Sequence, residues 1–243
     1  MDRLVFDRMA ALEGRHWWFV GRRGIIGTLI RRELDLPAGA RILEAGCGTG
    51  GNLDLLKTFG RLEAFEFDPQ ARAFAEAKLG APVAAGALPE DVPQPDASYD
   101  LIGLFDVLEH VEEDVESLRT LGRKLGPSGK LLVTVPAMPW LWSDHDVRHH
   151  HKRRYTRASL AAAVERAGLK TSKIGYFNFL LFPIAVLERI SAKLLRRRSD
   201  NEAMPASLLN KALGAIFGLE RHLVARLQVP FGLSLFAVIE RDR

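Results

Sequence analysis

A glycine-rich turn directly after a short apolar segment restricts the fold more strongly than any other part of this sequence. Arg41–Glu44 is expected to form a strand, and the turn that follows carries glycines at positions 46, 48 and 50. Glycine adopts backbone angles that other residues avoid, so the chain can turn tightly and a ligand can approach the main chain. Residues 52–57 are expected to form a helix, whose first N–H groups and partial positive charge would face that ligand. The turn therefore predicts a ligand-binding site.

Two classes of cofactor fit this turn. The glycine spacing over residues 46–51 satisfies the dinucleotide fingerprint, and Glu66 lies about where its ribose-binding acid is expected. The segment Glu44–Gly50 equally satisfies the first motif of proteins that bind S-adenosyl-L-methionine (SAM). The charge of Glu44 favours SAM over NAD, because a carboxylate repels a pyrophosphate and attracts the sulfonium and ammonium groups of SAM.

Two later segments resemble the fourth and fifth strands of a known enzyme family. Phe105–Val111 reads FDVLEHV, and Leu125–Pro136 reads LGPSGKLLVTVP. Both follow the glycine turn and the acid-ended strand Leu62–Asp68 in the order and at the distances that are usual in small-molecule SAM methyltransferases. The chain thus resembles the class I SAM-dependent methyltransferases over Arg41–Pro136. The resemblance implies an enzyme that uses SAM as its cofactor.

The resemblance also implies an α/β fold, in which a Rossmann-like, seven-stranded, mostly parallel sheet with an antiparallel last strand is sandwiched by helices. Residues 41–135 support it, because short apolar runs alternate there with amphipathic ones. We expect N-terminal helices and a helical insertion before the last strand. The expected segments are a helical cap at 1–36, the SAM-binding core at 37–177, the insertion at 178–229 and the last core strand at 230–243.

Local signals place individual elements. Thr156 suits the N-cap of a helix, and Gly168 suits its end. The polar, histidine-rich stretch Pro136–Tyr155 is expected to be a long functional loop after the fifth strand. The expected helices are Pro69–Leu79, Glu112–Leu125 and Thr156–Ala167, and the expected sixth and seventh strands are Lys170–Tyr176 and Gly232–Glu240.

The cofactor is expected at the carboxyl ends of the strands, near the point where the strand order reverses. Glu66, at the end of the second strand, could accept two hydrogen bonds from a ribose diol. The resemblance implies that Ala87 and Leu88 lie against the adenine, although many relatives have an aspartate where this chain has Gly86. The predicted cofactor-binding residues are Glu44, Gly46, Gly48, Gly50, Glu66, Phe67, Ala87, Leu88 and Phe105.

Methyl transfer from a sulfonium is an in-line displacement, which requires an aligned acceptor and, for a hydroxyl, removal of a proton. His110, next to Glu109, follows the fourth strand and is a candidate to orient or deprotonate the acceptor. The alternative is that this segment packs and caps the strand in relatives with different acceptors. Asp106, Glu109 and His110 also resemble the clusters by which some O-methyltransferases hold Mg²⁺. The motif is common, so we predict no metal.

The segment Trp140–Thr156 resembles the HD…H-x-R-R-Y-T segment of a methyltransferase subgroup that is often associated with bacterial polysaccharide and lipid biosynthesis. His145 and His151 are candidate bases, and two adjacent arginines could clamp a carboxylate or phosphate of the acceptor. The alternatives are a solvated basic loop, or arginines that merely pair with Asp144 and Asp146. Zinc is not expected, because adjacent histidines converge poorly on a tetrahedral ion and no cysteine is nearby. The predicted substrate-binding residues are Arg153, Arg154 and Tyr155.

The composition is that of one globular domain with modest insertions, at 243 residues, 47% hydrophobic and 26% charged. A net charge of +4 is too small to indicate nucleic acid as a partner. Cys47 is the single cysteine, which fits a reducing compartment, and no signal peptide is visible, so we expect a cytoplasmic protein. The patch His16–Arg23 combines two tryptophans with two arginines and could be a lid over the active site or packing in the core.

The apolar stretch Ile174–Leu187 is too short to span a bilayer. The basic run Lys193–Arg198 follows it, and an apolar segment that ends in basic residues can lie at an anionic membrane surface. Peripheral contact with the inner membrane surface would suit a lipid-linked acceptor. The alternative is a helical cap that packs on the domain or on a second subunit.

The sequence therefore predicts a SAM-dependent methyltransferase that acts on an oxygen of a small-molecule, glycan or lipid-linked acceptor. An RNA-end methyltransferase is an alternative, but the chain has no appended RNA-binding module and its aromatic residues are not spaced as a stacking platform. A non-catalytic SAM-binding protein is another alternative. It would need a broken cofactor site, whereas Glu44, the glycines and Glu66 are all present.

Overall fold

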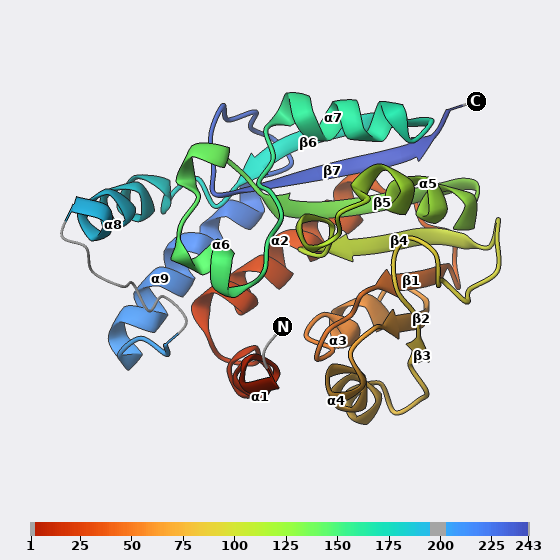
Figure 1. Cartoon of the computed structure of the whole chain (residues 1–243), viewed down its shortest axis with the longest axis horizontal. Helices are drawn as coiled ribbons and strands as arrows, with labels where there is room; N and C mark the ends of the chain where they lie inside the picture. The colour runs from red at the N-terminus through yellow and green to blue at the C-terminus, as the bar shows by residue number, and fades with distance from the viewer. Residues whose placement is uncertain (1–2, 195–202, 243) are drawn as a thin grey trace.

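A seven-stranded sheet forms the centre of the computed structural model, which describes residues 3–194 and 203–242. The strand order is β3-β2-β1-β4-β5-β7-β6, so the order reverses between β1 and β4 (Figure 1). β7 is antiparallel to its neighbours β5 and β6, and the other pairs are parallel, which confirms the predicted fold class. The strands are β1 Arg41–Ala45, β2 Arg61–Glu66, β3 Ala84–Ala85, β4 Tyr99–Phe105, β5 Leu125–Pro136, β6 Leu169–Phe177 and β7 Ser234–Arg241.

Helices cover both faces of the sheet (Figure 1). α2 packs against α9 on one face, and α5 packs against α7 on the other. The α-helices are α1 Arg3–Leu12, α2 Trp17–Glu33, α3 Leu53–Lys57, α4 Pro69–Leu79, α5 Asp114–Lys124, α6 Asp144–Arg148, α7 Arg157–Arg166, α8 Phe182–Leu194 and α9 Ser207–Leu219. The 3₁₀-helices are η1 Leu108–His110, η2 Pro139–Leu141 and η3 Glu220–His222.

The central strands are buried on both faces because successive side chains point to opposite sides of a sheet. Ile42 and Leu101 belong to the apolar cluster beneath α2 and α9. Their neighbours Leu43 and Ile102 belong to the cluster beneath α5 and α7. Burial on both faces explains why these strands read as nearly continuous apolar runs in the sequence.

Helix ends follow the capping signals of the sequence. α4 occupies Pro69–Leu79 as predicted, since the Asp68 side chain accepts hydrogen bonds from its first backbone N–H groups and Gly80 ends it with a φ of 69°. α7 likewise begins after Thr156, whose side chain caps the first turn. These local contacts explain why the boundaries of both helices could be read from the sequence.

Two regions differ from the sequence-based expectation. The helix after the glycine turn begins at Leu53 rather than at residue 52, and the Asn52 side chain donates a hydrogen bond to Glu44. The stretch after β5 is not a plain loop, because it contains η2 and α6. α6 is held by a capping box in which Ser143 and Asp146 bond each other's backbone N–H groups.

α2 and the predicted insertion form one layer of the fold. The rings of Trp17 and Phe217 meet edge to face with centroids 5.6 Å apart. The backbone N–H of Trp17 donates a hydrogen bond to the side-chain oxygen of Asn210 at 2.9 Å. Gly21 permits this approach, because a Cβ there would lie 2.4 Å from the Phe217 ring. The insertion is helical as expected, and the division of the chain into four segments stays a prediction.

The structure describes only part of the segment that is expected to contact a membrane. Across residues 3–194 and 203–242, the helices are too short or too polar to cross a bilayer. The side chains of the predicted basic run Lys193–Arg198 lie outside the part of the chain that the structure describes.

Candidate active site

The glycine-rich turn of residues 46–52 joins β1 to α3 at the carboxyl edge of the sheet. We call it the cofactor turn, because the sequence predicts a cofactor there. The Gly46 N–H donates to the Phe65 carbonyl of β2 at 3.0 Å, which fastens the turn to the neighbouring strand. Gly46, Gly48 and Gly50 have φ values of 67°, 55° and 84°, a region that favours glycine. A Cβ at Gly48 would meet no atom within 4 Å, whereas one at Gly50 would lie 3.0 Å from the Ala75 Cα. Gly48 therefore faces open space, and Gly50 allows α4 to pack closely.

Glu66 is fixed by the main chain around it. Its two oxygens accept hydrogen bonds from the N–H groups of Gly48 at 2.7 Å and Asp68 at 2.9 Å. Each carboxylate oxygen can accept a second bond, so Glu66 keeps capacity for the two hydroxyls of a ribose. The next side chain, Phe67, is 74% exposed and offers a ring face that an adenine could cover.

Glu44 is buried at the base of the cofactor turn. One oxygen accepts a hydrogen bond from Asn52 at 2.7 Å, and Oε2 has no hydrogen-bond partner among the described residues. Burial raises the pKa of Glu44 to about 7, although the bond from Asn52 and the nearby Arg22 act in the opposite direction. A cationic group of SAM near this carboxylate would stabilise its ionised form.

Gly86, in the loop after β3, has little room for a side chain. Gly86 is buried, and a Cβ there would lie 2.8 Å from the Asp91 carbonyl oxygen. An aspartate at this position would therefore require the loop to shift. Ala87 exchanges backbone hydrogen bonds of 2.7 and 2.9 Å with Asp91, and Leu88 packs against the core. Both stay predicted adenine contacts.

Arg22 is a site residue that the sequence placed only within the N-terminal patch. Its guanidinium extends from α2 to pair with Asp106 at the end of β4, and it lies 3.4 Å from the Thr134 hydroxyl of β5. It also lies over the rings of Trp18 and Phe105, 5.2 and 5.9 Å from their centroids. The sequence signal for the contact of Arg22 with Trp18 is their spacing, since residues four apart share a helix face. Arg22 thus connects the patch to the carboxyl ends of β4 and β5.

α1 is fastened to the cofactor turn through Glu13. This buried carboxylate accepts a hydrogen bond from the Thr49 hydroxyl at 2.7 Å and pairs with Lys78 of α4. A second contact joins Asp7 of α1 to Gln70 at 2.9 Å. The N-terminal segment is therefore joined to the glycine-rich turn and to α4.

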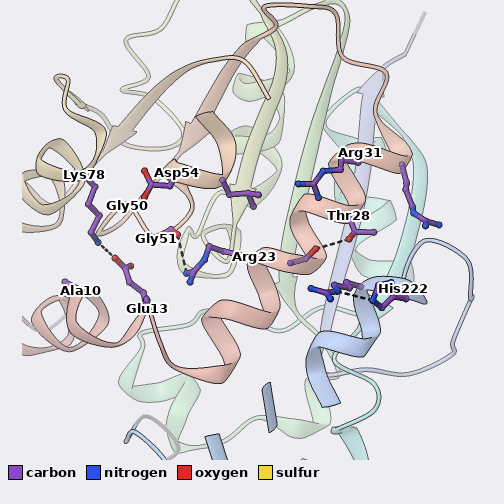
Figure 2. A pocket seen from close by; sticks show the side chains of 15 residues that line it. Ala10, Glu13, Arg23, Thr28, Arg31, Gly50, Gly51, Asp54, Lys78 and His222 are labelled. Carbon is purple, nitrogen blue, oxygen red and sulfur yellow. Dashed lines mark hydrogen bonds and ion pairs between the residues drawn. The ribbon is translucent and has the colours of Figure 1, made fainter. Parts of the chain in front are cut away.

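A cleft of about 900 Å³ lies beside the cofactor turn, between α1, α2 and the start of α3. Figure 2 shows Arg23 reaching the Gly51 carbonyl, at 3.3 Å, and Lys78 turned toward Glu13. Among the predicted cofactor residues Gly50 alone lines this cleft, so the cleft lies beside the predicted cofactor site of Glu44 and Glu66 rather than within it. The cationic side chains of its wall are Arg23, Arg31, Arg32, Lys78 and Arg221.

Side chains from two distant segments meet beyond the end of β4. Glu109 and His110 lie in η1 and His151 follows α6, and one ligand atom from each lies within 4.8 Å of the others. The rings of His110 and His151 are 4.7 Å apart, and His145 lies 6.0 Å from His151. Asp106 is not a member, because its carboxylate pairs with the arginine of α2. The sequence grouped Asp106 with Glu109 and His110, whereas in the structure His151 takes the place of Asp106 in this group.

Burial governs the charge of this cluster. Burial, together with the neighbouring His151 and His149, lowers the pKa of His110 to about 3, so its ring is neutral at pH 7. Burial and the nearby Asp106 carboxylate raise the pKa of Glu109 well above its ordinary value. Glu109 is 1% exposed, and its Oε2 has no hydrogen-bond partner among the described residues.

Asp146 organises the loop that carries His151. Its side chain is 0% exposed and accepts hydrogen bonds from His151 Nδ1 at 2.9 Å, Arg154 Nε at 2.7 Å and the Ser143 N–H at 2.9 Å. Burial alone would raise the pKa of Asp146, but the bonds from His151 and Arg154 hold it far below its ordinary value. Arg154 is buried as well and also donates to the Ala137 carbonyl at 3.0 Å.

The other predicted acceptor-binding residues also contact acids of the protein. Arg153 pairs with Asp114 at 2.9 Å, and the hydroxyl of buried Tyr155 donates to the same carboxylate at 3.0 Å. Burial and Asp114 raise the pKa of Tyr155, so its hydroxyl stays protonated. The pair of Arg154 with Asp146 matches the alternative in which the arginines pair with acids of the loop, whereas the partner of Arg153 is Asp114 rather than Asp144. A role of Arg153, Arg154 and Tyr155 in acceptor binding stays a prediction.

A family model described as a methyltransferase domain matches residues 19–174 of this chain. The chain belongs to this methyltransferase family. Membership confirms the predicted enzyme class, and with it SAM as the cofactor, which the names of related proteins share. The narrower subgroup of polysaccharide and lipid biosynthesis stays a prediction.

Individual relatives agree with the family. A Mycolicibacterium smegmatis protein named a probable SAM-dependent methyltransferase is 29% identical over 69% of this chain, and the match spans 65% of that protein, less than two thirds. The ubiquinone biosynthesis O-methyltransferase of Xanthomonas axonopodis pv. citri is 25% identical over 69% of this chain and 81% of its own length. A SAM-dependent methyltransferase from Mesorhizobium loti, 17% identical, shares the fold with a TM-score of 0.58 over 87% of this chain and 95% of that one.

Proposed function

We propose that this protein transfers the methyl group of SAM to a hydroxyl oxygen of a small-molecule, glycan or lipid-linked acceptor. The observation that carries the proposal is the pairing of His151 with buried Asp146, 2.9 Å from its Nδ1. An ionised carboxylate can only accept a hydrogen bond, so in the neutral form of the ring Nδ1 carries the proton and Nε2 is open to another partner. That partner would be the acceptor hydroxyl.

An oxygen acceptor would explain why several histidines gather beyond the end of β4. A hydroxyl must lose its proton during methyl transfer, and the cluster gathers His110, His145 and His151 just beyond β4, next to the cofactor edge. The relative from Xanthomonas axonopodis pv. citri is by name an O-methyltransferase, which supports the same class of acceptor atom.

The acceptor itself is inferred from two weaker features. The resemblance of Trp140–Thr156 to the polysaccharide and lipid subgroup supports a glycan or lipid-linked compound. Exposed apolar side chains on α8, among them Ile184 and Leu187, would suit an acceptor held at a membrane surface.

The first test is calorimetric titration of the whole chain with S-adenosylhomocysteine. Replacement Glu66→Ala is expected to weaken binding tenfold or more, about 1.4 kcal/mol or more, because the ribose loses its carboxylate partner. Glu90→Ala, on the exposed part of the nearby loop, is the matched control and is expected to bind as the wild type does. Absence of binding by the wild type would contradict the cofactor site.

The second test screens hydroxyl-bearing acceptors by mass spectrometry for the gain of one methyl group. His151→Asn and Asp146→Asn are expected to reduce the turnover number at least tenfold while binding of S-adenosylhomocysteine is retained. Methylation of nitrogen or carbon acceptors alone would contradict the oxygen assignment.

A further inference from the structure

We infer that Glu109, His110 and His151 form a binding site for a divalent first-row transition metal ion, with Zn²⁺ as the leading candidate. The role of the ion in catalysis rests on the proposed O-methylation. Its binding site rests on the geometry of the three side chains. It revises the sequence-based expectation of no metal, which considered Mg²⁺ at Asp106, Glu109 and His110.

The three side chains already converge. One ligand atom from each lies within 4.8 Å of the others. Ligands bound to one tetrahedral ion at about 2.0–2.2 Å are about 3.4 Å apart, so small side-chain movements suffice to bring these atoms around a cation. The two segments are also joined by their backbones, since the Lys152 N–H donates to the Glu109 carbonyl at 2.7 Å.

Both histidines are oriented in the way that metal ligands usually are. A ligating imidazole commonly uses its other nitrogen to bind a carboxylate or a backbone carbonyl, which fixes the ring and its tautomer. His151 binds Asp146 through Nδ1, and His110 hydrogen-bonds the backbone of His149. Each ring therefore has one nitrogen engaged by the protein and one left for the centre of the cluster.

Glu109 supplies the independent sign of a missing partner. The residue is 1% exposed, and its Oε2 has no hydrogen-bond partner among the described residues. A buried carboxylate oxygen without a partner is costly, and native proteins rarely keep one unless something binds there. A cation between Glu109 and the two histidines would satisfy it.

The donor set selects the kind of metal. Mg²⁺ and Ca²⁺ prefer oxygen ligands alone, whereas two imidazoles and one carboxylate suit Zn²⁺ and its neighbours in the first transition row. Three protein ligands leave a position open for an acceptor oxygen, whose hydroxyl would then lose its proton more readily. His110 and His151 would in that case act as ligands, and the hydroxyl proton would pass to solvent water instead of to a histidine base.

The test uses the whole untagged chain, stripped with a chelator and dialysed. Titration with Co²⁺, followed by its visible absorption, and with Zn²⁺, followed by calorimetry, is expected to show one ion bound per chain. Glu109→Gln, His110→Asn and His151→Asn are each expected to weaken Zn²⁺ binding tenfold or more. His150→Asn is the matched control: it alters the same run of histidines at an exposed residue with a φ of 56°, which asparagine tolerates, and should bind Zn²⁺ as the wild type does.

The outcomes separate the metal site from the proposed function. Binding of S-adenosylhomocysteine by each variant shows that it is folded. The metal site would be overturned if the wild type did not bind one metal ion per chain. It would also be overturned if Glu109→Gln and His110→Asn bound Zn²⁺ as tightly as the wild type does. If the stripped enzyme methylates its acceptor at an unchanged rate and Co²⁺ does not bind, O-methylation stands and the metal inference fails. If the ion binds as expected and no hydroxyl acceptor is methylated, the site stands and the proposed function fails.

Discussion

At the scale of single residues, Glu44 places a buried, titratable carboxyl at the edge where the cofactor is predicted to bind. It is 1% exposed, it has one unpartnered oxygen, and its pKa is raised to about 7 by burial. SAM carries a sulfonium and an ammonium, so a ligand near this carboxylate favours its ionised form. The affinity for the cofactor should therefore depend on pH near neutrality.

We predict that the affinity for SAM rises by up to about tenfold between pH 6 and pH 8, because one carboxylate must lose its proton for the cation to bind well. Calorimetry in two buffers of different ionisation enthalpy should show proton release on binding at pH 6.5. Glu44→Gln should bind more weakly and show little change of affinity with pH. A wild-type affinity that is constant from pH 6 to pH 8 would contradict the assignment.

The residues that the sequence could predict are those within continuous motifs. Glu44, the three glycines and Glu66 follow from spacing along one strand–turn–helix–strand unit. Arg22 and Asp146 could not be assigned in the same way, because their roles arise from contacts with Asp106 and His151 that only the folded chain brings together.

At the scale of elements, Glu220 of η3 holds the start of the segment that follows β6. Its side chain accepts hydrogen bonds from the backbone N–H groups of Asn178 at 2.5 Å and Leu180 at 2.8 Å, and the residue is 0% exposed. Burial nevertheless raises the pKa of Glu220 from 4.5 to about 7. Between these two values the native state holds a proton that the unfolded state has lost, so this carboxyl makes the free energy of unfolding fall as pH rises.

We predict that Glu220→Gln, which is neutral at every pH, gains stability relative to the wild type by about 1–2 kcal/mol between pH 5 and pH 8. Urea denaturation of both proteins at pH 5, 6, 7 and 8 measures this difference, and contributions from other buried carboxyls cancel in the comparison. Glu90→Gln, at an exposed position, is the control and should follow the wild type. Parallel stability curves for Glu220→Gln and the wild type would contradict the prediction.

Helices with strong capping signals at both ends could be predicted, and a very short helix without an apolar repeat could not. α4 and α7 match the expectation because Asp68, Gly80 and Thr156 cap them. α6 was missed because it is a helix of five residues without an apolar period, and it is held by the capping box of Ser143 with Asp146.

At the scale of the whole molecule, α8 and α9 expose apolar side chains that the fold does not cover. Ile184, Leu187 and Ile190 are 57%, 67% and 49% exposed on α8, and Leu208 is 83% exposed on α9. Isolated apolar residues at a surface are common, but a row on one helix indicates a surface that another body covers. The sequence left a membrane or a second subunit open as that body.

We predict that the full chain sediments with vesicles that contain an anionic lipid, and that the double variant Ile184→Glu with Leu187→Glu loses most of this binding, because it places charge on the apolar row. Binding of S-adenosylhomocysteine should be unchanged in the variant, which serves as the control for folding. If the wild type stays in the supernatant, the membrane assignment is wrong, and analytical ultracentrifugation would test for a second copy.

The pairing of β6 with β7 has a consequence for how this enzyme could be altered. Phe177 and Ser234 are partners in the antiparallel register, so the polypeptide leaves and re-enters the sheet at a single point. Replacing everything between them would change a hairpin connection, and the entropy of closing a loop grows only slowly with its length. Chimaeras that exchange this connection between relatives should therefore keep the sheet, provided that the contacts of Phe217 and Asn210 with Trp17 of α2 are retained.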